Sequence, residues 1–252
     1  MANLVTCVAA SILRGPVVGI ALALLNRMLH TILKTFAFVL LASIAVTAFA
    51  AEKGLHYLSP DSIDLTHFRP PPEENSPQDL ADLETVIAVS QTKSDEDCSK
   101  ASTIVNLDVY VWFGLPDGPL SKEQLKPVAE IATKVMGDAF SVAHVVKKKF
   151  DRKRPYLRSS EKVKLCVAAD ASSSYPSGHS AAAEVGAQFL AQIYPDKRQE
   201  LMHRAQQIAY ERIVGGVHHP ADTYAGMQIG DLVFDALGKN TQFKQDLDAV
   251  LH

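Results

Sequence analysis

This sequence contains little cysteine and tryptophan, and neither sign of charge is in large excess. Of 252 residues, three are cysteine and one is tryptophan, and 25 basic residues nearly balance 28 acidic ones. This composition excludes collagen-like, low-complexity and largely disordered chains, and a net charge of −3 gives no general reason to expect a nucleic-acid partner. The length allows one large domain or two small ones, and either can bury a core.

Acidic residues are absent from positions 1–50, whose charged residues are Arg14, Arg27 and Lys34. Subtracting these three positive charges from the net charge of −3 leaves −6 for residues 51–252. The sequence therefore divides into a basic, apolar leader and an acidic body.

The leader has the features of a secretory signal peptide. An uncharged apolar stretch, too short to cross a bilayer comfortably, follows Lys34 and ends in Ala48-Phe49-Ala50, the small-x-small pattern that signal peptidase cleaves. We predict a signal peptide at residues 1–50 and a periplasmic or secreted mature protein. The signal is complete if translation begins at Met28, in which case residues 1–27 are an over-called start instead of a long n-region. An uncleaved membrane anchor is the alternative.

The body contains no uncharged apolar run of membrane-spanning length after Ala51, so we expect no stable membrane association once the signal is cleaved. Cleavage also removes Cys7 and leaves Cys98 and Cys166. In an oxidising compartment such a pair is a disulfide candidate, whereas in a cytosol two buried thiols are more usual. The sequence leaves both arrangements open.

Strand signals are nearly absent from the body. From Asp79 onward apolar residues recur every three or four positions, which indicates helices, and Pro70-Pro71-Pro72 forbids a helix there. We predict an extended segment at 51–77 and a single all-α, helical-bundle domain at 78–252. Its helices are predicted near 78–92, 95–113, 121–150, 178–194, 196–214, 219–238 and 241–251.

The first of three polar clusters is the run KKKFDRKRP at 147–155, which has six basic side chains. Such a run is usually a solvated helix face or a non-specific polyanion patch. Here Lys147, Asp151 and Arg154 are spaced at i, i+4 and i+7, which predicts one shared helix face, and Pro155 is expected to end that helix. The face would present an ammonium and a guanidinium to one anion.

The second cluster, Tyr175-Pro176-Ser177-Gly178-His179, precedes a strong helix-forming stretch. Ser177 is predicted to be the N-cap, and Gly178 allows a close approach of the backbone. The free N–H groups of a helix N-terminus and the helix dipole would form a phosphate site beside His179. The alternative is an ordinary capped helix with a surface histidine.

The third cluster is ERIVGGVHHPAD at 211–222, in which Asp222 follows His218 by four positions. A carboxylate near an imidazole fixes its tautomer and stabilises its cation, which makes the histidine a nucleophile or a base. His218, His219 and Asp222 would in principle also bind zinc or a non-haem iron. We expect no metal, because Arg212 and the cations of the first cluster would repel it.

The three clusters resemble the tripartite signature of the type 2 phosphatidic acid phosphatase superfamily. They read Lys147-x6-Arg154-Pro155, Pro176-Ser177-Gly178-His179 and Arg212-x5-His218-x3-Asp222. Within that superfamily the chain is most similar to the bacterial class A non-specific acid phosphatases, through its signal peptide, the segment YLSPDSIDLTHFRPPPE and its helical body. The likeness covers residues 56–240. Glu211 departs from the pattern, which usually has a serine before the arginine, and this puts the phosphate affinity in doubt.

The resemblance implies a secreted acid phosphatase, with the fold shared by these phosphatases and the vanadium haloperoxidases. His218 would attack phosphorus and form a phosphohistidine, Asp222 would hold its other ring nitrogen, and protonated His179 would donate a proton to the leaving group. No metal or other cofactor is implied, and vanadate is expected to inhibit. The phosphate ligands would be Lys147, Arg154, Ser177, Gly178 and Arg212.

The expected substrates are small-molecule phosphate monoesters of broad range, hydrolysed best below neutral pH, and no nucleic-acid partner is expected. A lipid phosphate or diphosphate phosphatase and a vanadium haloperoxidase share the signature. The lipid enzymes generally place it among membrane spans, and the haloperoxidases are generally longer chains. A non-catalytic periplasmic anion-binding protein is a remote alternative, since its acid–base residues would be superfluous. No motif indicates an oligomeric state or favours an alcohol over water as the acceptor.

Overall fold

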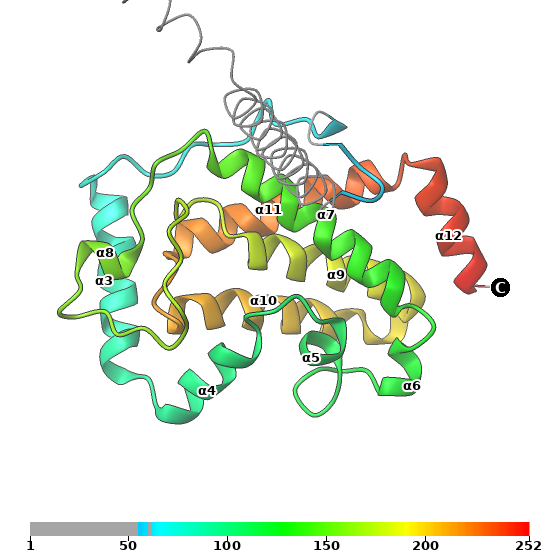
Figure 1. Cartoon of the computed structure of the whole chain (residues 1–252), viewed down its shortest axis with the longest axis horizontal. Coiled ribbons are helices and arrows are strands. Elements are labelled where there is room, and N and C mark those ends of the chain that lie inside the picture. Colours follow the sequence, from blue (N-terminus) through cyan, green and yellow to red (C-terminus); the bar gives the residue numbers. More distant parts are fainter. Residues whose placement is uncertain (1–54, 60–61, 252) are drawn as a thin grey trace, which may run out of the picture. The chain divides into compact units, whose positions relative to one another are not determined.

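The computed structural model describes residues 55–59 and 62–251, so the predicted signal peptide lies outside the described residues. These residues belong to one compact unit, Gly54–His252, which is helical, with no β-strand in the described ranges. The predicted all-α class is confirmed. The elements are α3 (Pro77–Thr92), α4 (Asp95–Thr103), α5 (Val109–Phe113), α6 (Lys122–Leu125), α7 (Ala129–Lys147), α8 (Pro155–Arg158), α9 (Gly178–Ile193), η2 (Pro195–Lys197), α10 (Arg198–Val214), α11 (Pro220–Leu237) and α12 (Thr241–Leu251) (Figure 1).

Helix α9 lies at the centre of the bundle, packed against α7, α10 and α11 (Figure 1). Its first half is rich in alanine, so neighbouring helices approach closely, while Phe189 and Leu190 fill the space further along. Both large side chains are fully buried in the main core with Trp112 and Met136. Burying a side chain of this size contributes about 1.5–3 kcal/mol. This packing fixes the position of the N-terminus of α9.

Two glycines let α11 pack closely on α9. A Cβ atom at Gly226 would clash with the carbonyl oxygen of Ser177, and one at Gly230 would lie 2.5 Å from Cβ of Glu184. Side chains at these positions would therefore push the two helices apart. The glycines hold the N-terminal half of α11 beside the start of α9, where the second and third clusters lie.

Most of the predicted helices are present, and two are interrupted. Those at 78–92, 178–194, 196–214, 219–238 and 241–251 are correct to within two residues. The predicted helix at 95–113 is wrong because Asp108 starts a new helix, its carboxylate accepting from the N–H groups of Tyr110 and Val111. The predicted helix at 121–150 is wrong because it breaks around Pro127, which has no N–H to donate, and because it ends at Lys147.

The predicted extended segment, residues 51–77, contains no α-helix at 55–59 and 62–76, and its last residue, Pro77, begins α3. The buried carboxylate of Asp138, on α7, accepts hydrogen bonds from the backbone N–H groups of residues 56–58 and anchors the segment to the bundle. Cys98 on α4 is joined to Cys166 by a disulfide, one of the two arrangements that the sequence left open. None of the described helices is both long and apolar enough to cross a membrane.

Candidate active site

The second and third clusters meet at the N-termini of α9 and α11. The backbone N–H of Ser177 donates to the carbonyl oxygen of Asp222 over 2.9 Å. Ser177 caps α9 as predicted, since its hydroxyl accepts from the N–H of Ser180 over 3.3 Å. Gly178 follows at the first helical position, where a Cβ atom would lie 3.0 Å from the ring of Phe140. Because the first N–H groups of a helix have no partner within it, this end of α9 is suited to bind an anion.

The first cluster is not a single helix face, contrary to the prediction. Helix α7 ends at Lys147, residues 148–154 are not helical, and Arg154 is the N-cap of the short α8. Pro155 begins this helix instead of ending one, because its fixed φ and missing N–H suit the first helical position. Asp151, which was predicted to share the face, is exposed.

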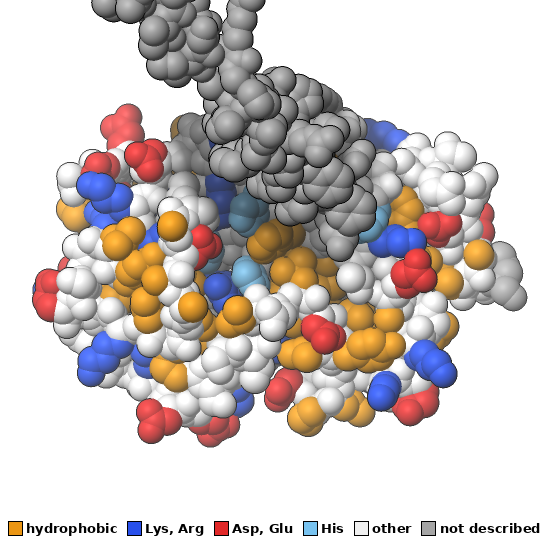
Figure 2. All heavy atoms as spheres, viewed as in Figure 1, with side chains coloured by type: hydrophobic (Ala, Val, Ile, Leu, Met, Phe, Trp, Pro, Cys, Tyr) orange, Lys and Arg blue, Asp and Glu red, His pale blue; other side chains and the backbone are white. Residues whose placement is uncertain are grey.

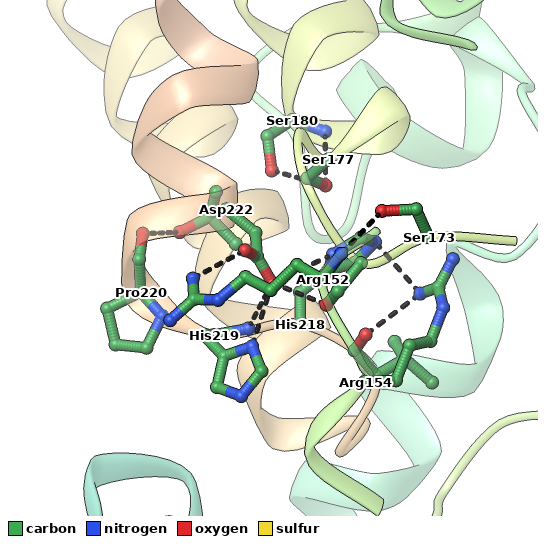
Figure 3. Close-up of polar contacts among 12 residues, drawn as sticks. Arg152, Arg154, Ser173, Ser177, Ser180, His218, His219, Pro220 and Asp222 are labelled. Carbon is green, nitrogen blue, oxygen red and sulfur yellow. Dashed lines mark hydrogen bonds and ion pairs between the residues drawn. The ribbon is translucent and has the colours of Figure 1, made fainter. Parts of the chain in front are cut away.

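Lys147 and Arg154 are nevertheless brought to one place by the segment 172–174. Nζ of Lys147 donates to the carbonyl oxygens of Ser173, at 2.7 Å, and Ser174, at 3.3 Å. Nε of Arg154 donates to the carbonyl oxygen of Ser172 over 3.0 Å. Since this segment leads directly into the second cluster, the three clusters form a single site (Figure 3).

Arg212 supplies a buried positive charge to this site. Its Nε and NH1 atoms are buried and have no hydrogen-bond partner within the described residues. Burial and the charge of Arg154 lower the pKa of Arg212 to about 10, and the same two causes lower the pKa of Lys147 to about 7. Three cations that destabilise one another form a site for an anion, whose charge would offset their repulsion.

Asp170 places a carboxylate at the edge of the site. NH2 of Arg154 lies 2.6 Å from its Oδ2, and the Asp170 side chain is half exposed. Partial burial opposes its charge, but the backbone N–H of Ser172 and the Arg154 guanidinium lower its pKa. Asp170 therefore competes with any bound anion for Arg154.

His218 is buried with its ring between a guanidinium and a carboxylate. NH1 of Arg154 lies 3.2 Å from Nε2, and Oδ2 of Asp222 lies 3.6 Å from Nδ1. An arginine can only donate, so Nε2 must be unprotonated and the proton must lie on Nδ1, facing Asp222. Burial, followed by the charges of Arg154 and Lys147, holds the pKa of His218 well below 6.5, although Asp222 opposes this shift. Its Nε2 therefore carries a lone pair at acid pH.

Asp222 is fully buried and shared among more partners than the sequence predicts. Its Oδ2 accepts from the hydroxyl of Ser174, at 2.5 Å, and from the backbone N–H of His219, at 2.8 Å. Nδ1 of His219 lies 3.1 Å from the same oxygen, closer than His218, although His219 lies outside the family motif. Oδ1 accepts from NH1 of Arg152 over 2.7 Å. Burial opposes ionisation, yet the contacts with His218 and His219 hold the pKa of Asp222 well below its usual range.

His179 is held by the segment that interrupts the predicted helix at 95–113. Its Nε2 lies 2.9 Å from the carbonyl oxygen of Val105, and its ring packs near Trp112 and Phe140, with ring centroids 5.8 and 5.5 Å apart. Burial and the charge of Arg212 lower the pKa of His179 to about 3. The expectation of a protonated His179 is therefore corrected for the enzyme before substrate binds: the ring is neutral until an anion offsets the nearby cations.

His144 borders the site and was missed by the sequence reasoning. It lies on α7, one turn before Lys147, and its ring packs on Phe140 with centroids 4.4 Å apart. A Cβ atom at Gly178 would lie 3.6 Å from its Cε1. Burial and the charge of Lys147 lower the pKa of His144. The i, i+3 spacing from Lys147 was the available signal.

Glu211 does not pair with the phosphate ligands. Its Oε1 accepts from NH1 of Arg204 over 2.8 Å, and Arg204 is itself anchored to the carbonyl oxygen of Trp112. Arg204 therefore pairs with the negative charge next to Arg212.

The described surface is hollowed near its centre. Figure 2 shows histidine, lysine and arginine side chains gathered there, beside hydrophobic ones. Within residues 55–59 and 62–251, no group of three or more histidine, cysteine, aspartate or glutamate residues has an arrangement that could hold a metal ion. The chemistry present in this region is that of fixed cations, helix N–H groups and imidazoles.

Residues 131–240 match the model of the PAP2 superfamily. The chain is 26% identical over 195 residues to an acid phosphatase of Zymomonas mobilis, covering 73% of this chain and 72% of that protein. It is 25% identical over 205 residues to a non-specific acid phosphatase of Providencia stuartii, covering 77% and 82%. A transmembrane PAP2-type phosphatidylglycerolphosphate phosphatase from Bacillus subtilis is similar in structure, with a TM-score of 0.46 and 20% identity over 66% of this chain and 87% of that one.

The matched region runs from near the start of α7 to just past the end of α11 and contains all three clusters. The chain is similar to the PAP2 superfamily over these residues, and the resemblance noted in the sequence is confirmed.

Proposed function

We propose that the mature protein is a secreted acid phosphatase that hydrolyses phosphate monoesters of broad range through a phosphohistidine on His218. One observation carries the proposal. The buried guanidinium of Arg212 has two nitrogens without partners in the described residues, in the same site as a neutral His218. A phosphoryl group would satisfy these donors and present phosphorus to Nε2. Fixed cations and helix N–H groups suit the spread charge of a phosphoryl transition state.

The first step forms a bond between Nε2 of His218 and phosphorus while the bond to the ester oxygen breaks. Arg154 must first transfer its NH1 hydrogen bond from Nε2 to a phosphoryl oxygen, which frees the lone pair. As Nε2 becomes bonded, the ring gains positive charge, and the carboxylate of Asp222 beside Nδ1 stabilises it. Water then attacks phosphorus and the P–N bond breaks, which releases phosphate.

The leaving oxygen needs a proton, and the low pKa of His179 limits where this proton can come from. Because burial and Arg212 lower that pKa to about 3, the free enzyme does not supply the proton. A phosphate ester that enters as the monoanion brings one, since its second pKa is about 6. Transfer from the ester to His179 within the complex gives an imidazolium beside the leaving oxygen. After donating the proton, neutral His179 would activate water for the second step.

An activity assay distinguishes the proposed acid phosphatase from a lipid phosphatase and from a haloperoxidase. The assay uses the purified chain with alkyl, sugar and aryl phosphate monoesters and a lipid phosphate, each with EDTA and with vanadate. We expect phosphate release from several water-soluble monoesters, no loss with EDTA, since no cofactor is proposed, and inhibition by vanadate. Release from the lipid phosphate alone would favour a lipid phosphatase, and bromide oxidation with vanadate and peroxide would favour a haloperoxidase. No phosphate release from any ester would contradict the proposal.

Export is the remaining part of the proposal. The leader and the disulfide between Cys98 and Cys166 both suit an oxidising compartment. N-terminal sequencing of protein recovered outside the cytoplasm is expected to begin at Ala51. A start upstream of Lys34 in the exported protein would contradict cleavage.

A further inference from the structure

Arg152 connects helix α3 to the catalytic carboxylate. Its NH2 donates to Oδ1 of Asp79 and Oδ2 of Asp82, each at 2.8 Å, and its NH1 donates to Oδ1 of Asp222 at 2.7 Å. Figure 3 shows the Arg152 side chain beside Asp222 and His219. The guanidinium is buried, with 5% of its side chain exposed. Arg152 belongs to the basic run at 147–155, but it is neither exposed to solvent nor one of the predicted phosphate ligands.

The charges of this network are unevenly shared. Asp79 is also paired with Arg158, at 2.7 Å, and accepts from the N–H of Asn75. The described contacts of Asp82 give Arg152 as its ion-pair partner. Of the two α3 carboxylates, Asp82 is therefore the one that is not shared with a second arginine in the described contacts.

We propose that Asp82 and Arg152 are positioning residues that hold Asp222 and keep enough negative charge on it to support His218. The inference rests on the proposed function. A guanidinium bound to Asp222 alone would draw its charge away from His218. The two carboxylates of α3 offset the guanidinium, so Asp222 is held in place yet still acts as an anion toward Nδ1. The charged groups that act on His218 from the elements packed around it are Asp222, Arg154 and Lys147.

This arrangement brings residues outside the superfamily match into the chemistry. Helix α3 precedes the matched residues 131–240, and both Asp79 and Asp82 lie on it. The extra helix would therefore set the reactivity of the nucleophile, while the matched region supplies the reacting groups.

The test is the isosteric variant Asp82→Asn, which removes one charge and keeps an oxygen for Arg152. Because Asp82 does not contact the phosphate ligands, we expect kcat on 4-nitrophenyl phosphate to fall about 3- to 10-fold. The inhibition constant of inorganic phosphate is expected to stay within about twofold, since the phosphate site is unaltered. The matched control is Glu84→Gln, which removes a charge from an exposed position on the same helix and is expected to leave both constants unchanged. An unchanged kcat, or a proportional loss of kcat and phosphate binding, would overturn the proposal.

A second measurement does not depend on turnover. In Arg152→Lys the charge remains but the forked contact with three carboxylates is lost. Arg154 still donates to Nε2 of His218 in this variant, so the readout is the proton on Nδ1, which faces Asp222. In ¹⁵N-labelled histidine we expect the Nδ1–H resonance of His218 to be observed in the natural protein and to be broadened by exchange with water in the variant. An unchanged Nδ1–H resonance in a folded Arg152→Lys protein would contradict the positioning role. If the natural protein released no phosphate, the proposed function would fail while this NMR measurement still tested the inference.

Discussion

NH1 of Arg154 lies 3.2 Å from Nε2 of His218, and NH2 of the same guanidinium lies 2.6 Å from Oδ2 of Asp170. The first contact occupies the lone pair of the nucleophile, and the second occupies a donor that a phosphoryl oxygen would use. An incoming phosphate group must take over both contacts. Arg154 therefore couples substrate binding to the exposure of Nε2, and the predictions below follow from this coupling and its neighbours.

Replacement of the two histidines is expected to have different effects on different leaving groups. His218→Ala removes the nucleophile, so we expect no turnover of any ester through the covalent route. His179→Ala is expected to cost about 10²- to 10⁴-fold on alkyl phosphates, where the leaving oxygen needs a proton. On 4-nitrophenyl phosphate, whose leaving group is stable as an anion, the loss is expected to be about tenfold or less. Steady-state kcat on both substrates checks this, and equal losses for His179→Ala would contradict the acid role.

Asp170→Asn is expected to tighten phosphate binding. The variant removes the carboxylate that competes for Arg154, and we expect the inhibition constant of inorganic phosphate to fall about tenfold. Arg212→Ala is expected to have the opposite effect. It removes a buried donor and should raise the inhibition constant of inorganic phosphate about 10- to 100-fold. Both constants come from product inhibition at one pH and ionic strength. Weaker phosphate binding in Asp170→Asn would show that this carboxylate supports the site instead of competing for it.

Activity is expected to be highest below neutral pH. Because burial and the nearby cations hold the pKa of His218 well below 6.5, its lone pair persists as the pH falls through the usual histidine range. On the alkaline side the complex loses the ester proton near pH 6, and Lys147, with its pKa lowered to about 7 by burial and Arg154, loses its charge. Both changes act in the same direction, so kcat/KM should decrease as the pH rises from 6 to 8. A profile that still rises at pH 9 would contradict this assignment.

Reduction of the disulfide is expected to destabilise the fold. Cys98 and Cys166 are 68 positions apart, so the bond constrains a long loop of the unfolded chain. A bridge of this kind typically contributes about 2–4 kcal/mol, and we expect the double variant Cys98→Ser/Cys166→Ser to lose about that much in urea unfolding at 25 °C. Reducing agent is expected to lower the Tm of the natural protein and not that of the double variant. Equal stability with and without the bond would contradict the prediction.

The parts of the site that could be predicted from the sequence are those set by local chemistry. Ser177 is an N-cap because a short hydroxyl precedes a helix-forming stretch, and Pro220 begins α11 because proline suits the first helical position. The motif spacings placed Lys147 and Arg154 together even though the helix face proposed for them is wrong. Their convergence depends on the carbonyl oxygens of residues 172–174, which carry no residue-type signal.

The parts that could not be predicted depend on contacts between distant segments. Val105 holds His179 through a backbone carbonyl, in a stretch whose apolar period predicts continuous helix. Arg152 lies within a basic run that is typical of a solvated face, and the packing of α3 and α11 gives it buried carboxylate partners. Periodicity reports which residues are buried, but not which polar groups the burial brings together.

A covalent intermediate on His218 is the central claim, and trapping it tests the claim most directly. The measurement mixes the protein with ³²P-labelled 4-nitrophenyl phosphate, quenches with alkali within milliseconds, and maps the label by peptide digestion. We expect label on the peptide that contains His218, stable to alkali and lost in acid, together with a burst of nitrophenol close to one equivalent. No burst and no labelled peptide during rapid turnover, or label on His179, would contradict the account.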